Sequence, residues 1–104
     1  MIVIFEQQYL RNLYEHGTTN DKKHHFEPYI EKYKERIDTL KRTLKIEDLF
    51  LISSLKYEVL QGDKQGISSI GVNHKYRIEF TVKENDNDTL LSVCNIIELS
   101  NHYK

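Results

Sequence analysis

The sequence predicts an α+β domain that contains a short N-terminal strand, two helices and then a meander of about four antiparallel strands. Two patterns indicate this class. Apolar residues recur every 3 to 4 positions, about the helical period, in the first half of the chain, whereas short apolar runs between turn residues fill the second half. The length of 104 residues, of which 38% are hydrophobic, suits a single domain over residues 1–104 with one core.

The first elements are a strand and a helix. Residues 1–5 form a short apolar run rich in β-branched side chains, which favours a strand. A helix is expected over residues 6–16, and Gly17 is suited to cap its C-terminal end. One face of that helix carries the apolar residues Tyr9, Leu10, Leu13 and Tyr14.

A second, longer helix is expected to begin near residue 27 or 28, because Pro28 fits only in the first turn of a helix. Its apolar positions form one continuous stripe, made of Phe26, Tyr29, Ile30, Tyr33, Ile37, Leu40 and Leu44. Tyr33 and Ile37 lie near the middle of the stripe and should be buried. Residues 46–52 then read as a short helix or turn in which Leu49, Phe50 and Ile52 pack inward.

The remaining strands follow at short intervals. They are expected at residues 56–60, 67–72, 75–83 and 89–99, with turns at residues 61–66, 73–74 and 84–88. Residues 75–83 alternate, so Tyr76 and Ile78 should face the core while Arg77 and Glu79 face outward. Residues 89–99 are apolar on both faces, which is typical of a central strand.

Charge and cysteine content narrow the class of protein. The chain has 15 basic and 16 acidic residues, so its overall field does not favour nucleic acid. The distribution of charge is nevertheless uneven, since basic residues dominate residues 21–45 and acidic residues dominate residues 83–98.

The sequence lacks an apolar run of about 18 residues and a secretory signal pattern, so we expect a cytoplasmic protein without a membrane partner. Cys94 lies in a strand-like run and is expected to be a buried thiol.

Residues 56–80 carry a family resemblance. A GD turn, an S-I-x-V-N segment and a closing aromatic-Arg-Ile-x-Phe segment resemble the HigB branch of the RelE/ParE superfamily of bacterial toxins. The matching residues are Gly62, Asp63, Lys64, Gly66, Ser69, Ile70, Val72, Asn73, Tyr76, Arg77, Ile78 and Phe80. The resemblance implies a RelE/ParE-like fold, with helices on one face of a twisted sheet and functional residues on the open face.

The resemblance also implies a function. The expected protein is the toxin of a type II toxin-antitoxin system, a ribosome-dependent mRNA endoribonuclease that works without metal or cofactor. Its expected partners are a HigA-like helix-turn-helix antitoxin, the ribosome and mRNA, with operator DNA contacted indirectly through the antitoxin. Two alternatives stay open: a non-catalytic, ParE-like inhibitor of DNA gyrase, and an attenuated toxin that serves mainly to bind its antitoxin.

Four residues are the catalytic candidates. Arg77 occupies the family arginine position and should face outward, where it can clamp a phosphate; a structural ion pair with Glu79 or Glu98 is the alternative. His102 and Tyr103 correspond to a C-terminal tail that supplies acid-base and stacking groups in relatives, although an ordinary frayed terminus would also account for them. Glu58 stands where many relatives have histidine and is a candidate base.

The expected RNA-binding residues are Lys56, Lys64, Lys75 and Asn73. Two departures from the family pattern weaken this set, because Gln61 replaces a lysine and Gly71 replaces an arginine that several relatives carry. If residue 71 shares the open face with Arg77, Gly71→Arg should add a second cation and raise cleavage at least about tenfold. The alternative is that Gly71 marks a β-bulge or a close backbone approach. The adjacent His24 and His25 lack a third ligand at a local spacing, so no metal site is expected.

Overall fold

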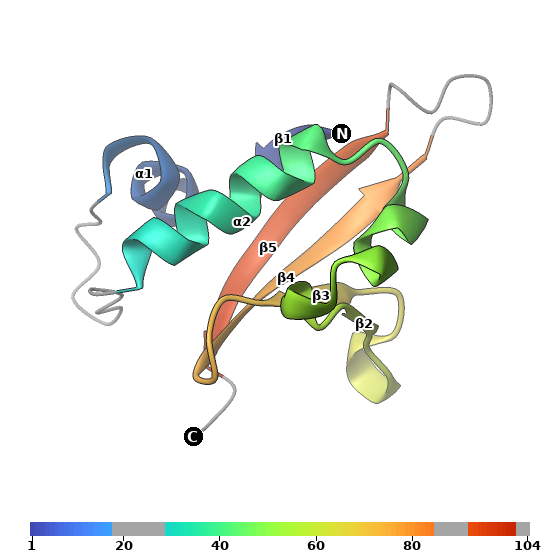
Figure 1. The fold of residues 1–104 in the computed structure, drawn as a ribbon. Coiled ribbons are helices and arrows are strands. Elements are labelled where there is room, and N and C mark those ends of the chain that lie inside the picture. The colour runs from blue at the N-terminus through green and yellow to red at the C-terminus, as the bar shows by residue number, and fades with distance from the viewer. Residues whose placement is uncertain (18–28, 85–91, 102–104) are drawn as a thin grey trace.

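A computed structural model of the chain describes residues 1–17, 29–84 and 92–101 (Figure 1). The fold is mixed α+β, as predicted. Its helices and strands are β1 (Ile2–Phe5), α1 (Gln8–His16), α2 (Ile30–Arg42), the 3-10 turns η1 (Ile46–Leu51), η2 (Ser53–Leu55) and η3 (Gly62–Lys64), β2 (Glu58–Val59), β3 (Ser68–Gly71), β4 (Tyr76–Lys83) and β5 (Val93–Asn101).

The strands form one sheet in the order β1-β5-β4-β3-β2. Strands β2 to β5 pair in antiparallel fashion, which confirms the predicted four-stranded meander. The N-terminal strand β1 joins the sheet parallel to β5, with Ile2 opposite Val93. Strand β5 therefore lies inside the sheet, as its apolar sequence predicted.

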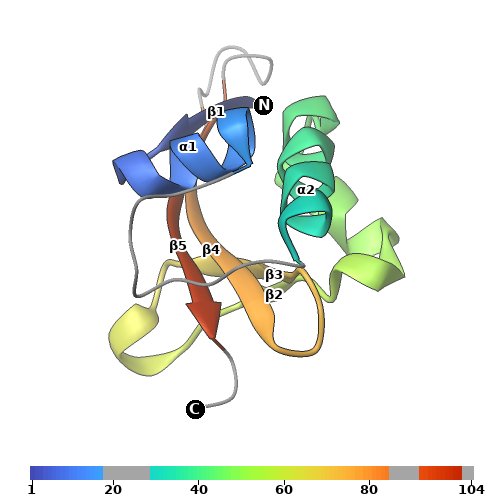
Figure 2. The same cartoon turned by 90° about the vertical axis from the view of Figure 1, so that its left-hand side faces the viewer.

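Helix α2 lies across one face of the sheet, and α1 packs beside α2 and β1 (Figures 1 and 2). Tyr33 and Ile37 of α2 are fully buried, which confirms the burial predicted for the middle of the stripe. The hydroxyl of Tyr33 donates a hydrogen bond of 2.8 Å to the carbonyl of Leu10, so the buried phenol is satisfied and joins the two helices. The strands contribute further core residues, including Ile70, Ile78, Phe80, Cys94 and Ile96.

The boundaries of both helices differ slightly from the prediction. Helix α1 ends as expected at Gly17, which adopts a left-handed conformation with φ 71°. Helix α2 spans Ile30–Arg42 and ends there because Thr43 is extended; the start predicted at residue 27 or 28, and Phe26 of the stripe, lie outside the described residues. Leu44 therefore leaves the helical stripe and is 54% exposed, so its predicted core position is wrong.

The segment after α2 packs differently from the prediction. Residues 46–51 form a 3-10 turn, in which side chains about three positions apart share a face, so Ile46 and Leu49 contact the core. Phe50 and Ile52 are 63% and 40% exposed, which contradicts the inward packing expected of them. The Phe50 ring instead lies edge-on to Tyr57, with a centroid separation of 4.5 Å.

Two local irregularities shape the strands. Strand β2 is only two residues long, shorter than the predicted 56–60, because Lys56 adopts a left-handed conformation before it. In β5, Glu98 pairs with Glu79 and Ile96 pairs with Phe80, so Ile97 is an extra residue that forms a β-bulge. The bulge resets the alternation, and Ile96 and Leu99 consequently both face the core although they are three positions apart.

Cys94 is buried, and burial raises the pKa of its thiol to about 12. None of the helices among residues 1–17, 29–84 and 92–101 is long and apolar enough to cross a membrane.

Candidate functional site

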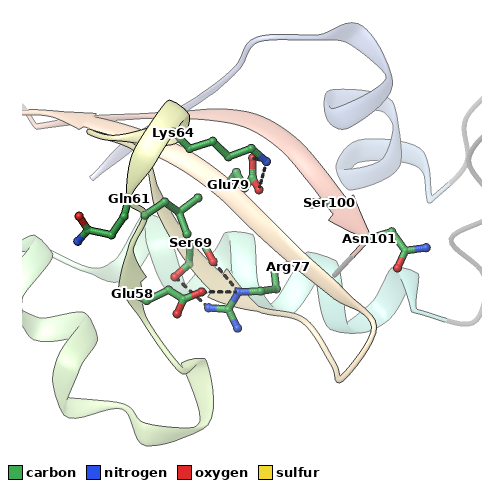
Figure 3. A pocket seen from close by; sticks show the side chains of 9 residues that line it. Glu58, Gln61, Lys64, Ser69, Arg77, Glu79, Ser100 and Asn101 are labelled. Atoms are coloured by element: carbon green, nitrogen blue, oxygen red, sulfur yellow. Dashed lines mark hydrogen bonds and ion pairs between the residues drawn. The ribbon is translucent and has the colours of Figure 1, made fainter. Parts of the chain in front are cut away.

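A cavity of about 310 Å³ opens on the sheet face opposite α2 (Figure 3). Its lining comes from β2, β3, β4, β5 and the turn around η3, and consists of Glu58, Leu60, Gln61, Lys64, Ser69, Arg77, Glu79, Ser100 and Asn101. Strand register explains why these residues meet. Glu58 pairs with Ser69, and Ser69 pairs with Glu79, so one row of side chains crosses the open face from β2 to β4. Arg77 lies two residues before Glu79 on the same face.

Arg77 is held by several acceptors at the centre of this cavity. Its Nε donates to Ser69 Oγ at 2.5 Å, and its Nη2 donates to the backbone carbonyl of Lys56 at 2.6 Å. The same Nε lies 3.5 Å from Glu58 Oε1 (Figure 3). The Arg77 side chain is 14% exposed, so the guanidinium is fixed in place but still reaches the cavity.

Arg77 forms its ion pair with Glu58, which the sequence analysis proposed as a catalytic base. The alternative interpretation of Arg77 was a structural ion pair with Glu79 or Glu98, and neither of these is the observed partner. The structure thus brings a candidate base and a candidate phosphate-binding cation into one cavity. The Glu58 side chain is 53% exposed, so its carboxylate is accessible from solvent.

Glu79 forms a separate pair with Lys64. The Lys64 ammonium donates to both carboxylate oxygens of Glu79, at 3.1 Å and 2.9 Å (Figure 3). That hydrogen bond is the main cause of a raised pKa for Lys64. The Glu79 side chain is only 8% exposed and the Lys64 side chain is 50% exposed. Lys64 lines the cavity as expected, but a buried carboxylate already balances its charge.

Gly71 lies directly opposite Arg77 in the regular register of β3 and β4, so it shares the open face and does not mark a bulge. A Cβ at residue 71 would lie 3.4 Å from Arg77 Nη1 and 3.5 Å from the carbonyl oxygen of Leu55. Both are ordinary van der Waals distances, so an alanine would fit at residue 71, whereas a longer side chain would meet the Arg77 guanidinium. The structure therefore supports neither the bulge nor a backbone approach that requires glycine.

Comparison of the sequence with models of protein families identifies the family of this chain. The model of RelE-like toxins of the type II toxin-antitoxin system HigB matches residues 3–93. This chain belongs to the HigB-like toxin family. Curated proteins give no significant match.

Solved structures show the same fold as this HigB-like toxin. A YoeB/ParE toxin from Agrobacterium tumefaciens is 21% identical, with a TM-score of 0.61 over 99% of this chain and 100% of that one. A heterotetrameric YoeB-YefM toxin-antitoxin complex from Staphylococcus aureus contains a chain that is 24% identical, with a TM-score of 0.57 over 99% of this chain and 98% of that one. At these identities the likeness is one of fold.

Three of the predicted RNA-binding residues of the toxin lie outside the set that lines the cavity. Asn73 shapes the turn between β3 and β4, because its Oδ1 accepts from the backbone N–H groups of Lys75 and Tyr76 at 2.8 Å and 2.7 Å. Lys75 extends over the Tyr76 ring, with its Nζ 5.4 Å from the centroid. Lys56 contributes its backbone carbonyl to Arg77, and its side chain is exposed.

His102 and Tyr103 lie outside the described residues, as do His24 and His25. His102 and Tyr103 follow Asn101 in the sequence, and Asn101 lines the cavity, so the described residues end at the site to which the tail was predicted to contribute.

Sequence reasoning missed Ser69, Ser100 and Asn101 as lining residues. The alternation of β4 combined with strand pairing could have indicated Ser69, but strand pairing is a tertiary property. Within the described ranges, no cluster of three His, Cys, Asp or Glu side chains could hold a metal ion.

Proposed function

We propose that this HigB-like toxin is an mRNA endoribonuclease that acts on the ribosome without a metal ion. The observation that carries the proposal is the cavity in which Arg77 and Glu58 lie together on the open face of the sheet. A fixed guanidinium is suited to the nonbridging oxygens of a phosphate, where charge gathers in the transition state. An exposed carboxylate beside it is suited to accept a proton.

The proposed reaction proceeds by attack of the ribose 2′-oxygen on the adjacent phosphorus. Glu58 accepts the proton of the 2′-hydroxyl as the new P–O2′ bond forms, and Arg77 stabilises the phosphorane charge. The P–O5′ bond then breaks, and His102 donates a proton to the leaving 5′-oxygen. The products are a 2′,3′-cyclic phosphate and a 5′-hydroxyl. Tyr103 stacks on a splayed base, and Lys64, Lys56, Lys75 and Asn73 are the proposed further RNA contacts.

The proposed partners follow from the type II system that the family model describes. We propose a HigA-like helix-turn-helix antitoxin that neutralises the toxin in the cytoplasm and carries it to operator DNA. Two of the solved structures of similar fold are YoeB-YefM complexes, which supports a proteinaceous antitoxin as partner. The ribosome and its bound mRNA are the proposed targets.

Primer extension on mRNA incubated with ribosomes and purified toxin tests the activity. Arg77→Ala should lower the cleavage rate by about 10² or more, because it removes charge stabilisation in the transition state. Arg42→Ala removes the same side chain from the exposed end of α2 and should cleave at the wild-type rate. Truncation before His102 should lower the rate in the same way as Arg77→Ala. Wild-type cleavage by both Arg77→Ala and the truncated chain would place the active site elsewhere.

A second candidate is a toxin that binds its target without catalysis, either as a gyrase inhibitor or as an attenuated antitoxin-binding protein. One observation favours it: both cations of the cavity are already paired, Arg77 with Glu58 and Lys64 with Glu79. A wild-type protein that binds its antitoxin but leaves ribosome-bound mRNA intact would support this candidate. Loss of gyrase supercoiling activity in its presence would then distinguish inhibition from attenuation.

A further inference from the structure

Lys56 has an unusual backbone conformation. With φ 49° and ψ 49°, it is the single non-glycine residue in the left-handed region among the described residues. A side chain with a Cβ rarely adopts this conformation unless the surrounding structure imposes it. The conformation follows η2 and turns the chain toward β2.

This turn directs a main-chain carbonyl at the candidate site. The carbonyl oxygen of Lys56 accepts the 2.6 Å hydrogen bond from Arg77 Nη2, while Ser69 Oγ accepts from Nε at 2.5 Å. Two short hydrogen bonds to two different segments thus hold two nitrogens of one planar guanidinium, and a longer one of 3.4 Å joins Nη2 to the carbonyl of Ser69. Rotation about the Nε–Cζ bond would break the Lys56 hydrogen bond, so the orientation of the guanidinium plane depends on where this carbonyl points.

The turn is itself anchored from the helical side of the sheet. Arg36 of α2 donates from Nε to the carbonyl of Gly71 at 2.9 Å and from Nη2 to the carbonyl of Ser54 at 3.4 Å. The Leu55 side chain is fully buried, and its carbonyl lies beside Gly71. Arg36 therefore links η2 to β3, and the Lys56 carbonyl is fixed relative to the strand that faces Arg77.

We propose that Lys56 is a positioning residue, which acts through its left-handed backbone and its carbonyl to orient Arg77 toward the phosphate. The catalytic consequence rests on the proposed endoribonuclease function. The positioning itself does not, and it can be measured on the protein alone. The proposed RNA contact of Lys56 uses its ammonium group; the positioning role is separate and uses its main-chain carbonyl.

A matched pair of variants separates these roles. Lys56→Asn and Lys56→Val both remove the ammonium group. Asparagine tolerates the left-handed region, whereas a β-branched residue does not. At saturating ribosome-bound mRNA, the cleavage rate of Lys56→Val should be at least about tenfold lower than that of Lys56→Asn, because a small misplacement of a catalytic group is costly. Equal rates in two folded variants would overturn the proposal, and equal rates that are both below the wild-type rate would assign the function of Lys56 to its ammonium group.

Nitrogen-15 NMR of the arginine side chains provides the measurement that needs no RNA. In the wild-type toxin, Arg77 should give separate Nη1 and Nη2 signals, assigned by their loss in Arg77→Lys, because the Lys56 hydrogen bond prevents rotation. The two signals should persist in Lys56→Asn and merge in Lys56→Val. Merged signals in the wild-type protein would overturn the proposal even if Lys56→Val does not fold. Separate wild-type signals without RNA cleavage would support positioning and refute the proposed function.

Discussion

A side chain that binds phosphate must be held in one orientation and still be reachable. Arg77 meets both needs, because Ser69 and Lys56 bind its Nε and Nη2 while 14% of the side chain stays exposed. Under the proposed function, the entropy cost of ordering this long side chain would be met during folding rather than during RNA binding. Gly71 lies directly opposite Arg77, so a long side chain at residue 71 would meet the guanidinium.

We predict that Gly71→Arg lowers cleavage by about tenfold or more, because a second guanidinium would displace Arg77 and repel it. This outcome is the opposite of the gain that the family pattern suggested. Gly71→Ala is the matched control. Its Cβ would make ordinary van der Waals contacts at 3.4 Å and 3.5 Å, so it should retain the wild-type rate. Cleavage assays on both folded variants test this prediction, and a rate gain in Gly71→Arg would contradict it.

The Lys64–Glu79 pair should contribute to stability. Lys64→Met leaves the carboxylate of Glu79, which is 8% exposed, without its cation and should lower the free energy of unfolding by about 1–3 kcal/mol. Because the folded-state pKa of Lys64 is raised, this contribution is present below about pH 10.4, the ordinary lysine value, and is lost as pH rises through the folded-state pKa. Urea unfolding at neutral and alkaline pH measures both effects.

Lys32→Met provides the control for that experiment, since Lys32 pairs with Glu35 on the surface of α2, where both side chains are at least 50% exposed. It should change the free energy of unfolding by less than about 0.5 kcal/mol. Equal losses for the Lys32 and Lys64 variants would show that the cavity pair is an ordinary surface pair.

At the scale of elements, two irregular segments place the site. The bulge at Ile97 lets Ile96 and Leu99 both face the core, and Glu98 consequently lies opposite Glu79. The 3-10 turns between α2 and β2 bring Lys56 next to Arg77. Regular helices and strands supply the scaffold, whereas the turns bring the Lys56 carbonyl to Arg77 at the cavity.

The end of α2 offers a test of which apolar positions belong to the core. Ile37→Ala should lower the free energy of unfolding by about 2–5 kcal/mol, because it leaves a cavity in a fully buried position. Leu44→Ala, at a position that the sequence stripe also includes, should cost less than about 1 kcal/mol because Leu44 is 54% exposed. Urea unfolding monitored by circular dichroism measures both. Similar losses for the two variants would contradict the observed end of the helix at Arg42.

The whole molecule is nearly neutral, with a formal net charge of −1, and the cavity itself balances two cations against two carboxylates. Long-range attraction to RNA is therefore weak, and under the proposed function recognition would depend on contacts made in the cavity and on the ribosome. This balance differs from that of proteins whose RNA affinity comes from an extended basic surface.

Binding of free single-stranded RNA should accordingly depend little on salt. With Arg77 and Lys64 as the cavity cations, the slope of log affinity against log salt should be no steeper than about −1.4. Glu79→Gln releases Lys64 from its carboxylate partner and should steepen the slope by up to about 0.7, toward that limit. Fluorescence anisotropy over a salt series measures both slopes. A wild-type slope beyond about −4 would show that another basic surface, such as that of α2, binds RNA.

The sequence by itself determined the order of elements, the buried stripe of α2, the alternation of β4 and the outward position of Arg77. These are local properties, because periodicity reports which face of an element is apolar. The family resemblance rested on turn and strand residues of the same local kind, and the family model confirms it.

Only the tertiary structure decided which groups meet Arg77. Strand register brought Ser69 and Glu58 to it, and the left-handed turn at Lys56 added a carbonyl that no side-chain pattern encodes. The exposure of Leu44 and Phe50 likewise depended on where α2 ended and on the 3-10 geometry that followed. The physical reason is common to these cases. Pairing between distant segments is set by the packing of the whole chain, and a sequence window contains only one side of each contact.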